Sequence, residues 1–527
     1  MNATVNPVEP AAAVKQHPHP WVPDQGDGSY RNPILCADYS DPDVIRHGDD
    51  FYLTASSFNC TPGLPILHSR DLVNWTLVNH ALKNLPDERY REVQPGGGVW
   101  APALRFHAGR FWIFFPTPDE GIYVTTANHP AGEWSPPQLV QAGKGLIDPC
   151  PLWDDDGQAY LVHAYAHSRS GLKHMLRVCP MAPDGSRLLG EGQIVFHDPA
   201  RHPTLEGPKF LKKDGWYYIL APAGGVQTGW QVVLRSRNIY GPYEDKIVLA
   251  QGRTPINGPH QGALVDLPNG EWWFVHFQDA GVYGRVTHLQ PVKWQDGWPL
   301  MGINQDANGT GEPVMQFQKP EIVSTHAAVP QTSDAFDSPR LGLQWQWHAN
   351  HEECWCSLDQ RPGWLRLFAQ PVTNGELGRT PNLLLQKFPA YTFSVKTLVE
   401  LAAQTVGEEA GLLVAGLACA AVALRRTEHG VKIIFRHDGV ESELAEASDL
   451  PVKLRVRVSE GGLCQFSFAL QDQRWTAVPA TFQAQPGVWI GAKVGLYAIK
   501  PGTGQGGHAD FSGFRMLPAD ENSGLTD

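Results

Sequence analysis

The stretch EGPKFLKKDGWYYI, residues 206–219, decides the fold class, because an Asp-Gly pair in it separates an apolar run from an aromatic one. Asp-Gly and Asn-Gly pairs between such runs are the strongest short-range signal of a β-hairpin. The same order of proline, apolar run, glycine turn and aromatic run occurs five times before residue 304. The prolines that mark the five copies are Pro42, Pro102, Pro149, Pro208 and Pro259.

Successive prolines of this series lie 47 to 60 residues apart. An antiparallel unit that recurs about every 50 residues is typical of a β-propeller blade. The pattern therefore predicts an all-β fold with a five-bladed β-propeller over residues 29–304. A tandem of ordinary β-sandwiches with chance turn spacing is the alternative.

The repeat stops after Gly302, and runs with alternating apolar and polar residues follow. Examples are residues 432–435, 452–458, 465–468, 488–491 and 494–497. Alternation with period two over many short runs predicts a second domain, a jelly-roll β-sandwich over residues 334–518. We expect residues 305–333 to be a linker, residues 1–28 an N-terminal extension and residues 519–527 a tail.

Composition narrows the class of protein. The 527 residues carry 42 Lys and Arg against 54 Asp and Glu, a formal net charge of −12. An acidic surface repels phosphate backbones, so we expect no nucleic-acid partner. No apolar run is long enough to span a membrane, no signal peptide is visible and the 8 cysteines are scattered. These features predict a cytoplasmic protein without a membrane partner, and they leave a homo-oligomer open.

One position of the repeat carries unusual side chains. The first strand of a propeller blade lies innermost, so the residues just before it meet at one mouth of the central channel. In the five copies these residues are Asp41, Trp100, Asp148, Glu206 and His260. Asp41 alone could be a turn residue and His260 alone a structural histidine. Three carboxylates crowded on one axis shift each other's pKa values, a cost that indicates a functional site.

Paired carboxylates across a gap the size of a sugar perform glycoside hydrolysis. One protonates the leaving oxygen, and the other activates water or attacks carbon directly. A third carboxylate can raise the pKa of the acid, because like charges resist simultaneous ionisation. Trp100 and Phe58 would offer aromatic faces to the C–H surface of a sugar.

The chain resembles glycoside hydrolase family 43 in a series of motifs that occur in order over residues 30–302. They are YRNPIL at 30–35, SDPDVIR at 40–46, LVNW at 72–75, GVWAP at 98–102, IDP at 147–149, EGP at 206–208, GR at 284–285 and WQDGWP at 294–299. Residues 494–497 and 509–511 resemble, more loosely, the concanavalin-like sandwich that follows the propeller in the family's β-xylosidases.

This resemblance implies a role for each matching residue. Asp41 falls where the general base sits, Asp148 on the acid that tunes pKa, and Glu206 on the general acid. Arg285 falls on the arginine that holds the terminal sugar, and Phe58 and Trp100 fall on walls of the pocket. His260 falls on a histidine that coordinates calcium in some members. The resemblance therefore implies substrate binding by these residues, with no required cofactor and a possible calcium ion near His260.

Together these observations predict an exo-acting, inverting glycoside hydrolase that releases terminal pentoses, above all β-D-xylose from xylo-oligosaccharides. Inversion follows from the repeat, because Asp41 and Glu206 belong to copies that are not neighbours in a ring of five, which leaves room for a water. An α-L-arabinofuranosidase or a bifunctional enzyme is the alternative. A non-catalytic carbohydrate-binding propeller is more remote, since it would not need three acids. We also expect the glycine-rich loop Lys500–Gly507 to reach the mouth of the site.

Overall fold

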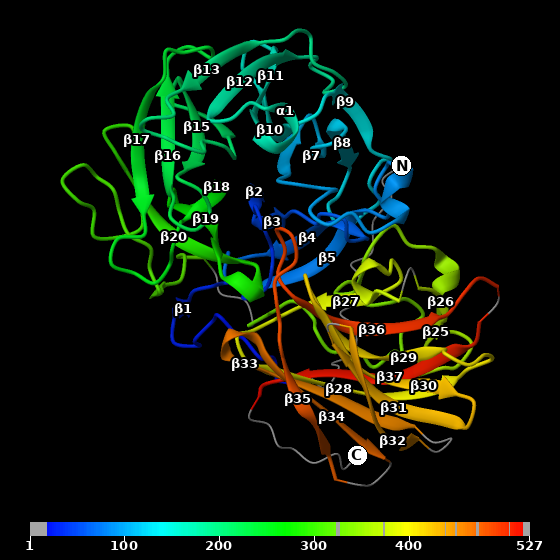
Figure 1. The fold of residues 1–527 in the computed structure, drawn as a ribbon. Helices are drawn as coiled ribbons and strands as arrows, with labels where there is room; N and C mark the ends of the chain where they lie inside the picture. Colours follow the sequence, from blue (N-terminus) through cyan, green and yellow to red (C-terminus); the bar gives the residue numbers. More distant parts are fainter. Residues whose placement is uncertain are drawn as a thin grey trace, which may run out of the picture.

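The computed structural model describes residues 18–322, 327–372, 375–437, 439–447, 451–470, 474–504 and 506–519. Most of the predicted N-terminal extension and nearly all of the predicted tail, residues 1–17 and 520–527, lie outside this part of the chain. The described residues form a propeller and a sandwich, seen in Figure 1 with the ring of blades above and the sandwich below. The predicted all-β fold is confirmed.

Each copy of the sequence repeat forms one four-stranded antiparallel sheet, which confirms the five predicted blades. In chain order the blades are β2(Asp43–His47), β3(Asp50–Thr54), β4(Gly63–Ser69) and β5(Trp75–Leu82); β6(Ala103–His107), β7(Arg110–Thr117), β8(Gly121–Ala127) and β9(Gln138–Ala142); β10(Leu146–Trp153), β11(Ala159–Tyr165), β12(Met175–Met181) and β13(Gln193–His197); β14(Lys209–Lys213), β15(Trp216–Ala223), β16(Trp230–Ser236) and β17(Glu244–Ala250); β18(His260–Asp266), β19(Trp272–Asp279), β20(Arg285–Gln295) and β21(Trp298–Met301).

The blades hold together because their second strands are apolar on both faces. In β7, for example, Phe111, Ile113, Phe114 and Phe115 are all buried. Each pair of neighbouring blades shares an apolar cluster among the described residues, including the pair formed by the last and the first blade. A strand covered on both faces loses the alternating pattern and becomes a continuous apolar run, which is why the aromatic runs of the repeat mark blade interiors.

The ring closes without a strand shared between the ends of the chain. β18 of the last blade lies beside β2 of the first, and Arg46 Nη2 contacts Asp266 Oδ2 across this junction at 2.6 Å. Outside the blades, β1(Ser29–Arg31) pairs with β22(Gln316–Gln318). The predicted linker, residues 305–333, therefore supplies a strand that ties the N-terminal segment to the propeller.

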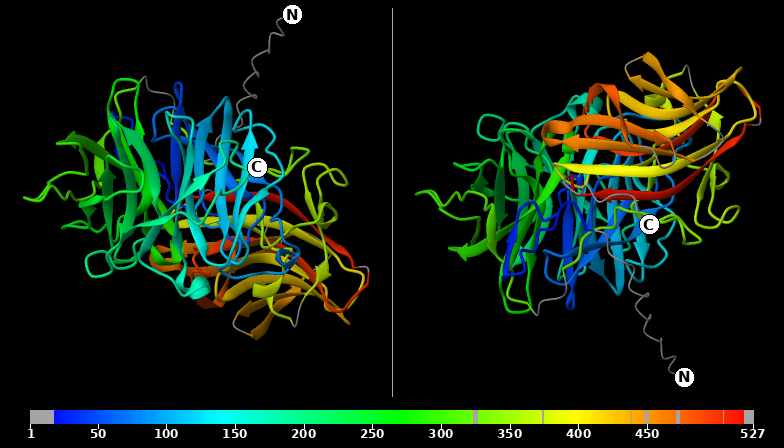
Figure 2. Two further views of the ribbon diagram at one scale, coloured as in Figure 1. Left: turned by 90° about the horizontal axis from the view of Figure 1, so that it is seen from above. Right: turned by 90° about the horizontal axis from the view of Figure 1, so that it is seen from below.

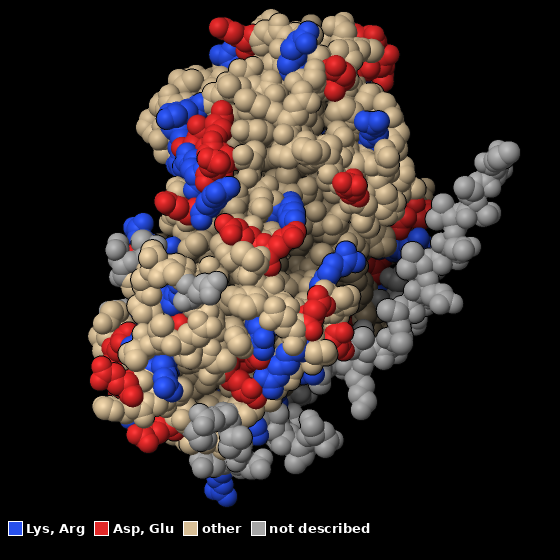
Figure 3. Space-filling model, turned by 90° about the vertical axis from the view of Figure 1, so that its right-hand side faces the viewer, with Lys and Arg blue, Asp and Glu red and all other residues tan. Residues whose placement is uncertain are grey.

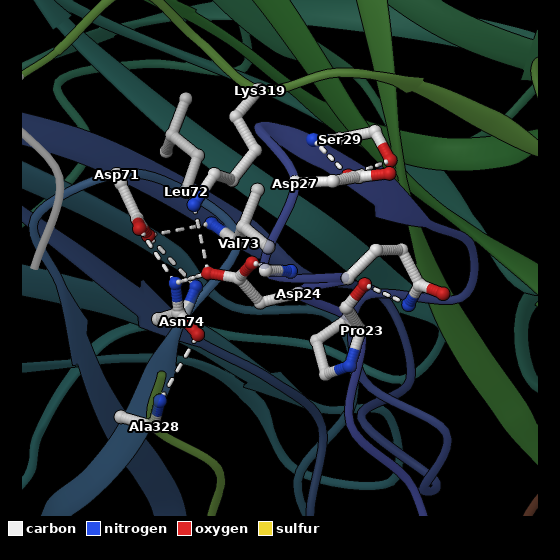
Figure 4. Close-up of polar contacts among 12 residues, drawn as sticks. Pro23, Asp24, Asp27, Ser29, Asp71, Leu72, Val73, Asn74, Lys319 and Ala328 are labelled. Atoms are coloured by element: carbon white, nitrogen blue, oxygen red, sulfur yellow. Dashed lines mark hydrogen bonds and ion pairs between the residues drawn. The ribbon is translucent and has the colours of Figure 1, made fainter. Parts of the chain in front are cut away.

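Polar contacts fix these segments to the first blade (Figure 4). Asp24 accepts hydrogen bonds from Lys319 Nζ at 2.8 Å and from Asn74 Nδ2 at 2.9 Å. Asn74 is held in turn by Asp71, and its side-chain oxygen accepts the backbone N–H of Ala328 at 3.0 Å. The turn between β4 and β5, part of the motif at 72–75, thus joins three segments that are distant in sequence.

The second domain is a sandwich of two sheets, which are antiparallel apart from one short parallel pair. One contains β23(Gln346–Trp347), β27(Leu384–Lys387), β36(Lys493–Lys500), β29(Glu409–Ala415), β30(Cys419–Thr427), β31(Gly430–His437) and β32(Val440–Ala447), with β26(Gln370–Pro371) beside β36. The other contains β24(Cys356–Ser357), β25(Leu365–Phe368), β37(His508–Leu517), β28(Phe393–Ala402), β33(Val452–Ser459), β34(Leu463–Leu470) and β35(Thr476–Gln483). Along β33 the buried and partly exposed residues alternate, as the period-two pattern requires.

One predicted strand is wrong. Residues 488–490 form bends, and with Gly491 they belong to the loop between β35 and β36; Trp489 has a left-handed φ of +66°. An apolar run of four residues carries no information that distinguishes a strand from a loop packed against another domain. This loop rises from the sandwich towards the propeller (Figure 1).

The two domains pack closely along one side of the propeller (Figure 2). Thr61 and Trp347 exchange backbone hydrogen bonds of 3.0 and 2.5 Å, and the side chain of Asn350 bonds twice to the backbone of Leu85. The largest apolar cluster of the sandwich also includes Tyr283 and Val286 of the propeller. The interface is therefore part of the folded core.

The described surface agrees with the composition. On the face in Figure 3, acidic and basic side chains are interspersed. No helix of the described residues is long and apolar enough to cross a membrane. All 8 cysteines lie in the described ranges and are free thiols.

Candidate active site

The inner strands place two of the three carboxylates by unusual backbone geometry. Asp41, just before β2, and Asp148, within β10, have left-handed φ values of +54° and +56°. Aspartate tolerates this conformation better than most residues, and strain of this kind gathers at functional sites. The pairing of β10 with β11 shifts register between Ile147 and Cys150, a bulge that turns Asp148 out of the ladder.

Asp41 lies in a dense set of hydrogen-bond donors. Its Oδ2 accepts from Ser40 Oγ at 2.7 Å and from Ser56 Oγ at 2.6 Å. Arg285 Nη1 contacts Oδ1 at 3.1 Å and also donates to Ser40 Oγ at 2.9 Å. Two hydroxyls and a guanidinium around one carboxylate match the donors that a negative charge needs in a buried place.

Asp148 lies in the opposite kind of environment. It is 4% exposed, and among the residues that the structure describes Oδ2 accepts only the backbone N–H of Gly207, at 2.8 Å. Burial raises the pKa of Asp148 to about 8, and the charge of the neighbouring Glu206 adds to the effect. At neutral pH Asp148 therefore holds a proton beside Glu206.

Glu206 is the member of the set that reaches solvent, with 27% of its side chain exposed. Its Oε1 lies 3.2 Å from Nε2 of His260, which is buried and stands at the start of β18. His260 therefore orients Glu206. It lies next to the site but is buried, so the prediction that it contacts the substrate directly gains no support.

Aromatic side chains form a wall next to the carboxylates. Phe58 and Val99 exchange backbone hydrogen bonds of 2.8 and 3.0 Å, and this pairing brings the rings of Phe58 and Trp100 to 6.4 Å. A Cβ at Gly98 would lie 2.1 Å from the carbonyl oxygen of Phe58, so this approach requires glycine. Trp100 Nε1 donates to Gly96 O at 3.0 Å, which fixes the indole.

The sandwich contributes a residue that the sequence alone did not identify. Trp489 is half exposed, and its ring lies 6.4 Å from the ring of Trp100. The guanidinium carbon of Arg285 lies 5.6 Å from the centroid of the Trp489 ring. Asp38 explains this placement, because it accepts the backbone N–H of both Arg285 and Gly491, at 2.9 and 3.0 Å. Asp38 therefore ties the arginine of the propeller to the loop of the sandwich.

The loop that we expected at the mouth lies elsewhere. In Lys500–Gly507, of which Gln505 lies outside the described residues, Gly507 N donates to Glu408 and Gly507 O accepts from Ala369 N. Both partners belong to the sandwich, so this expectation was wrong. Glycine content alone indicates flexibility, whereas the loop at 484–491 reaches the site through an aromatic side chain.

The predicted site residues thus form one connected group. Arg285 joins Asp41 to Trp489, and Trp489 lies against Trp100, which in turn lies against Phe58. The charges of Glu206 and Asp41 both act on Asp148. Besides Trp489, the sequence reasoning missed Asp38, Ser40 and Ser56. Ser40 could have been noticed as the residue next to Asp41, but no local signal marks Ser56 or Asp38.

The residues around His260 do not fit a calcium cage. Calcium takes six to eight oxygen ligands, whereas the His260 side chain has only nitrogens to offer, and its Nε2 already contacts Glu206. Its Nδ1 is buried without a hydrogen-bond partner. Within the described ranges no group of three or more His, Cys, Asp or Glu side chains is arranged to hold a metal ion. The calcium prediction gains no support from this donor set.

Two family models match the chain. Residues 30–299 match glycosyl hydrolases family 43, and residues 333–517 match the β-xylosidase C-terminal concanavalin A-like domain. The two ranges correspond to the propeller and the sandwich.

Individual relatives match over nearly the whole chain. A putative β-xylosidase of Xylanibacter ruminicola is 42% identical over 474 residues, which are 90% of this chain and 86% of that protein. A non-reducing end α-L-arabinofuranosidase of Bacteroides ovatus is 30% identical over 533 residues, 92% of this chain and 94% of that protein. The crystal structure of a xylan β-1,4-xylosidase from Bacillus halodurans aligns with a TM-score of 0.82 at 26% identity, covering 92% of this chain and 99% of that one.

Proposed function

We propose that this chain, which belongs to glycosyl hydrolase family 43, is an exo-acting, inverting β-xylosidase that removes single β-D-xylose units from xylo-oligosaccharides. One observation carries the proposal: three carboxylates lie together at the inner strands in three different environments. Asp41 is surrounded by donors, Asp148 is buried and protonated, and Glu206 is partly exposed. The names of the relatives support the choice of xylose.

Each environment suits one step of the hydrolysis. Glu206, which reaches solvent, donates a proton to the glycosidic oxygen as the bond from that oxygen to the anomeric carbon breaks. A water adds to the anomeric carbon, and Asp41 takes its proton. Asp148 and Glu206 resist simultaneous ionisation, so the pair retains one proton at neutral pH, and Glu206 carries this proton when it donates it to the glycosidic oxygen. The reaction needs only water and these side chains, so it requires no cofactor.

The aromatic side chains beside the carboxylates favour cleavage at the end of an oligosaccharide. Trp100 comes from the propeller and Trp489 from the sandwich, and the two rings meet 6.4 Å apart next to Arg285. Aromatic rings from two domains restrict the room beside the carboxylates, and such a restriction suits a terminal sugar better than the middle of a polymer. Arg285, which donates to Ser40 and Asp41, is placed to hold the hydroxyls of that sugar.

An α-L-arabinofuranosidase, or an enzyme with both activities, is the second candidate. The arabinofuranosidase of Bacteroides ovatus, similar over 92% of this chain, is the observation that favours it. Purified protein should be assayed with an aryl β-D-xyloside and an aryl α-L-arabinofuranoside under the same conditions. We expect a higher kcat/KM on the xyloside, and the reverse ratio would assign the second function.

The stereochemistry tests the assignment of the base. If Asp41 activates water, cleavage of a β-xyloside releases α-xylose first, before mutarotation. Proton NMR of the anomeric signals during the first minutes decides this. Initial β-xylose would mean that a carboxylate attacks carbon directly and that the proposed pair is misassigned.

A further inference from the structure

A second layer of polar side chains lies in the propeller channel beneath the three carboxylates. Asp43 on β2 and Cys150 on β10 each follow a carboxylate by two residues, and Lys209 on β14 follows Glu206 by three. All three side chains of this layer are buried. A buried charge is costly unless it has a partner or a function, so the charges of this layer need an explanation.

The backbone around Lys209 is fixed against blade three. Gly207 N donates to Asp148 Oδ2 at 2.8 Å, and Phe210 N donates to Cys150 Sγ at 3.2 Å. Lys209 lies between these two contacts in the sequence. The start of β14 therefore brings Lys209 next to the strand that carries Asp148.

The side chain of Lys209 leaves blade four and reaches blades one and two. Its Nζ donates to Pro102 O at 2.5 Å and lies 3.8 Å from Asp43 Oδ1. Blade four is a neighbour of neither blade one nor blade two in a ring of five, so this side chain crosses the channel. Pro102 and Asp43 each follow a residue of the catalytic layer by two, so the ammonium group lies beneath that layer.

The buried charges of this second layer do not cancel. Asp43 Oδ2 accepts from Arg105 Nη1 at 2.8 Å and from Leu104 N at 2.6 Å. Its Oδ1 has no hydrogen-bond partner among the described residues, and the ammonium of Lys209 is 3.8 Å away. One carboxylate thus lies between two cations, which leaves one positive charge in excess beneath the catalytic carboxylates.

We propose that Lys209 is a positioning residue of the reaction, and that its buried ammonium sets the pH at which Asp148 and Glu206 lose the proton that they share. This inference rests on the proposed hydrolysis, in which that proton goes to the glycosidic oxygen. The other charged or titratable groups that act on the pair are Asp41 from blade one, His174 from blade three and His260 from blade five.

The charge of Lys209 opposes the other influences on Asp148. Burial and the charge of Glu206 raise the pKa of Asp148, whereas the charge of Lys209 lowers it. A general acid is most effective when its pKa lies near the working pH. The lysine therefore limits the pH at which the pair still holds its proton, and its removal should raise that pH.

The pH profile of kcat/KM on xylobiose tests the proposal, because its basic limb reports the loss of the proton that the pair donates. Lys209→Met keeps the length of the side chain but removes its charge, so the basic limb should move to higher pH by about 0.5–1. Lys213→Met, on the same strand at a partly exposed lysine that pairs with Asp214, is the matched control and should leave the limb in place. An unmoved limb in Lys209→Met, with kcat/KM lowered by one factor at every pH, would make Lys209 purely structural and overturn the proposal.

A change of opposite sign tests the same charge if Lys209→Met does not fold. Asp43→Asn keeps an oxygen that can accept Leu104 N but removes the negative charge of the second layer. The excess positive charge grows, so the basic limb should move to lower pH. A limb that stays in place, or that moves to higher pH, overturns the proposal.

A carbon-13 NMR titration separates this inference from the proposed function, because it needs no turnover. In protein labelled at the aspartate carboxyl carbons, the signal that disappears in Asp148→Asn belongs to Asp148. Its titration midpoint should lie at higher pH in Lys209→Met than in the unaltered protein. Equal midpoints overturn the inference whatever substrate the enzyme cleaves. A shifted midpoint in a protein that cleaves no xyloside would support the inference and refute the proposed function alone.

Discussion

Asp41 and Asp148 occupy comparable places in blades one and three, and both have left-handed backbones, yet their surroundings differ. Asp41 accepts hydrogen bonds from two serines and an arginine. Asp148 accepts one backbone N–H, and its pKa is raised to about 8 by burial and by Glu206. The repeat therefore determines where a side chain lies, whereas its neighbours from other blades determine what it can do.

The largest effect should follow from Asp41→Asn. Asparagine retains the shape and can still accept hydrogen bonds, but it cannot take a proton from water. Because help of this kind is worth about 10²–10⁴-fold, we expect kcat to fall by that factor on xylobiose and on aryl xylosides alike. Ser56→Ala, which removes one donor to Asp41 and leaves the base in place, is the matched control and should lose much less. Near-normal turnover by Asp41→Asn would remove Asp41 from the mechanism.

Glu206→Gln should show a loss that depends on the leaving group. A poor leaving group needs its proton, so kcat on xylobiose should fall by about 10²–10³-fold. A nitrophenyl group leaves with little help, so the loss on that substrate should be much smaller. Steady-state rates on the two substrates measure the difference. Equal losses on both would contradict the role of Glu206 as the acid and would move that role to Asp148.

Trp489→Ala should have a smaller effect, on the Asp41 side of the site. Removing the indole exposes Arg285, which donates to Asp41, and opens the wall beside Trp100. We expect KM for xylobiose to rise about 2–12-fold, the range of one lost aromatic contact, with a modest loss in kcat. Val440→Ala, a change at an exposed apolar residue of β32, is the control. Unchanged KM would show that the sandwich takes no part in substrate binding.

The sequence predicted the propeller and the group of site residues for a physical reason. Each blade is a local hairpin unit with its own turn residues, so Asp214-Gly215 and its counterparts reveal the period directly. Asp41, Asp148 and Glu206 could be found because they occupy one position of that period. Trp489, Asp38 and Ser56 could not be found in this way, since their role depends on contacts between blades and between domains. The apolar run at 488–491 predicts a strand where the structure has a loop, because a local pattern carries no information on such contacts.

The smallest predicted effect concerns the thermal stability of the protein, and it tests the buried environment of Asp148. The pKa of Asp148 is raised from 3.8 to about 8, so between these values the folded protein binds a proton that the unfolded chain has released. Stability then falls as pH rises through this range, because the unfolded state holds fewer protons than the native state.

Asp148→Asn removes the titration but can still accept the N–H of Gly207. The Tm of Asp148→Asn minus the Tm of the unaltered protein should therefore be about 1–3 °C larger at pH 8 than at pH 4.5, although the variant loses activity. Thermal unfolding across this range measures the difference, with Asp359→Asn as a control at an exposed aspartate. A Tm difference that stays constant with pH would mean that Asp148 is ionised in the folded protein and resembles Asp41 in charge as well as in position.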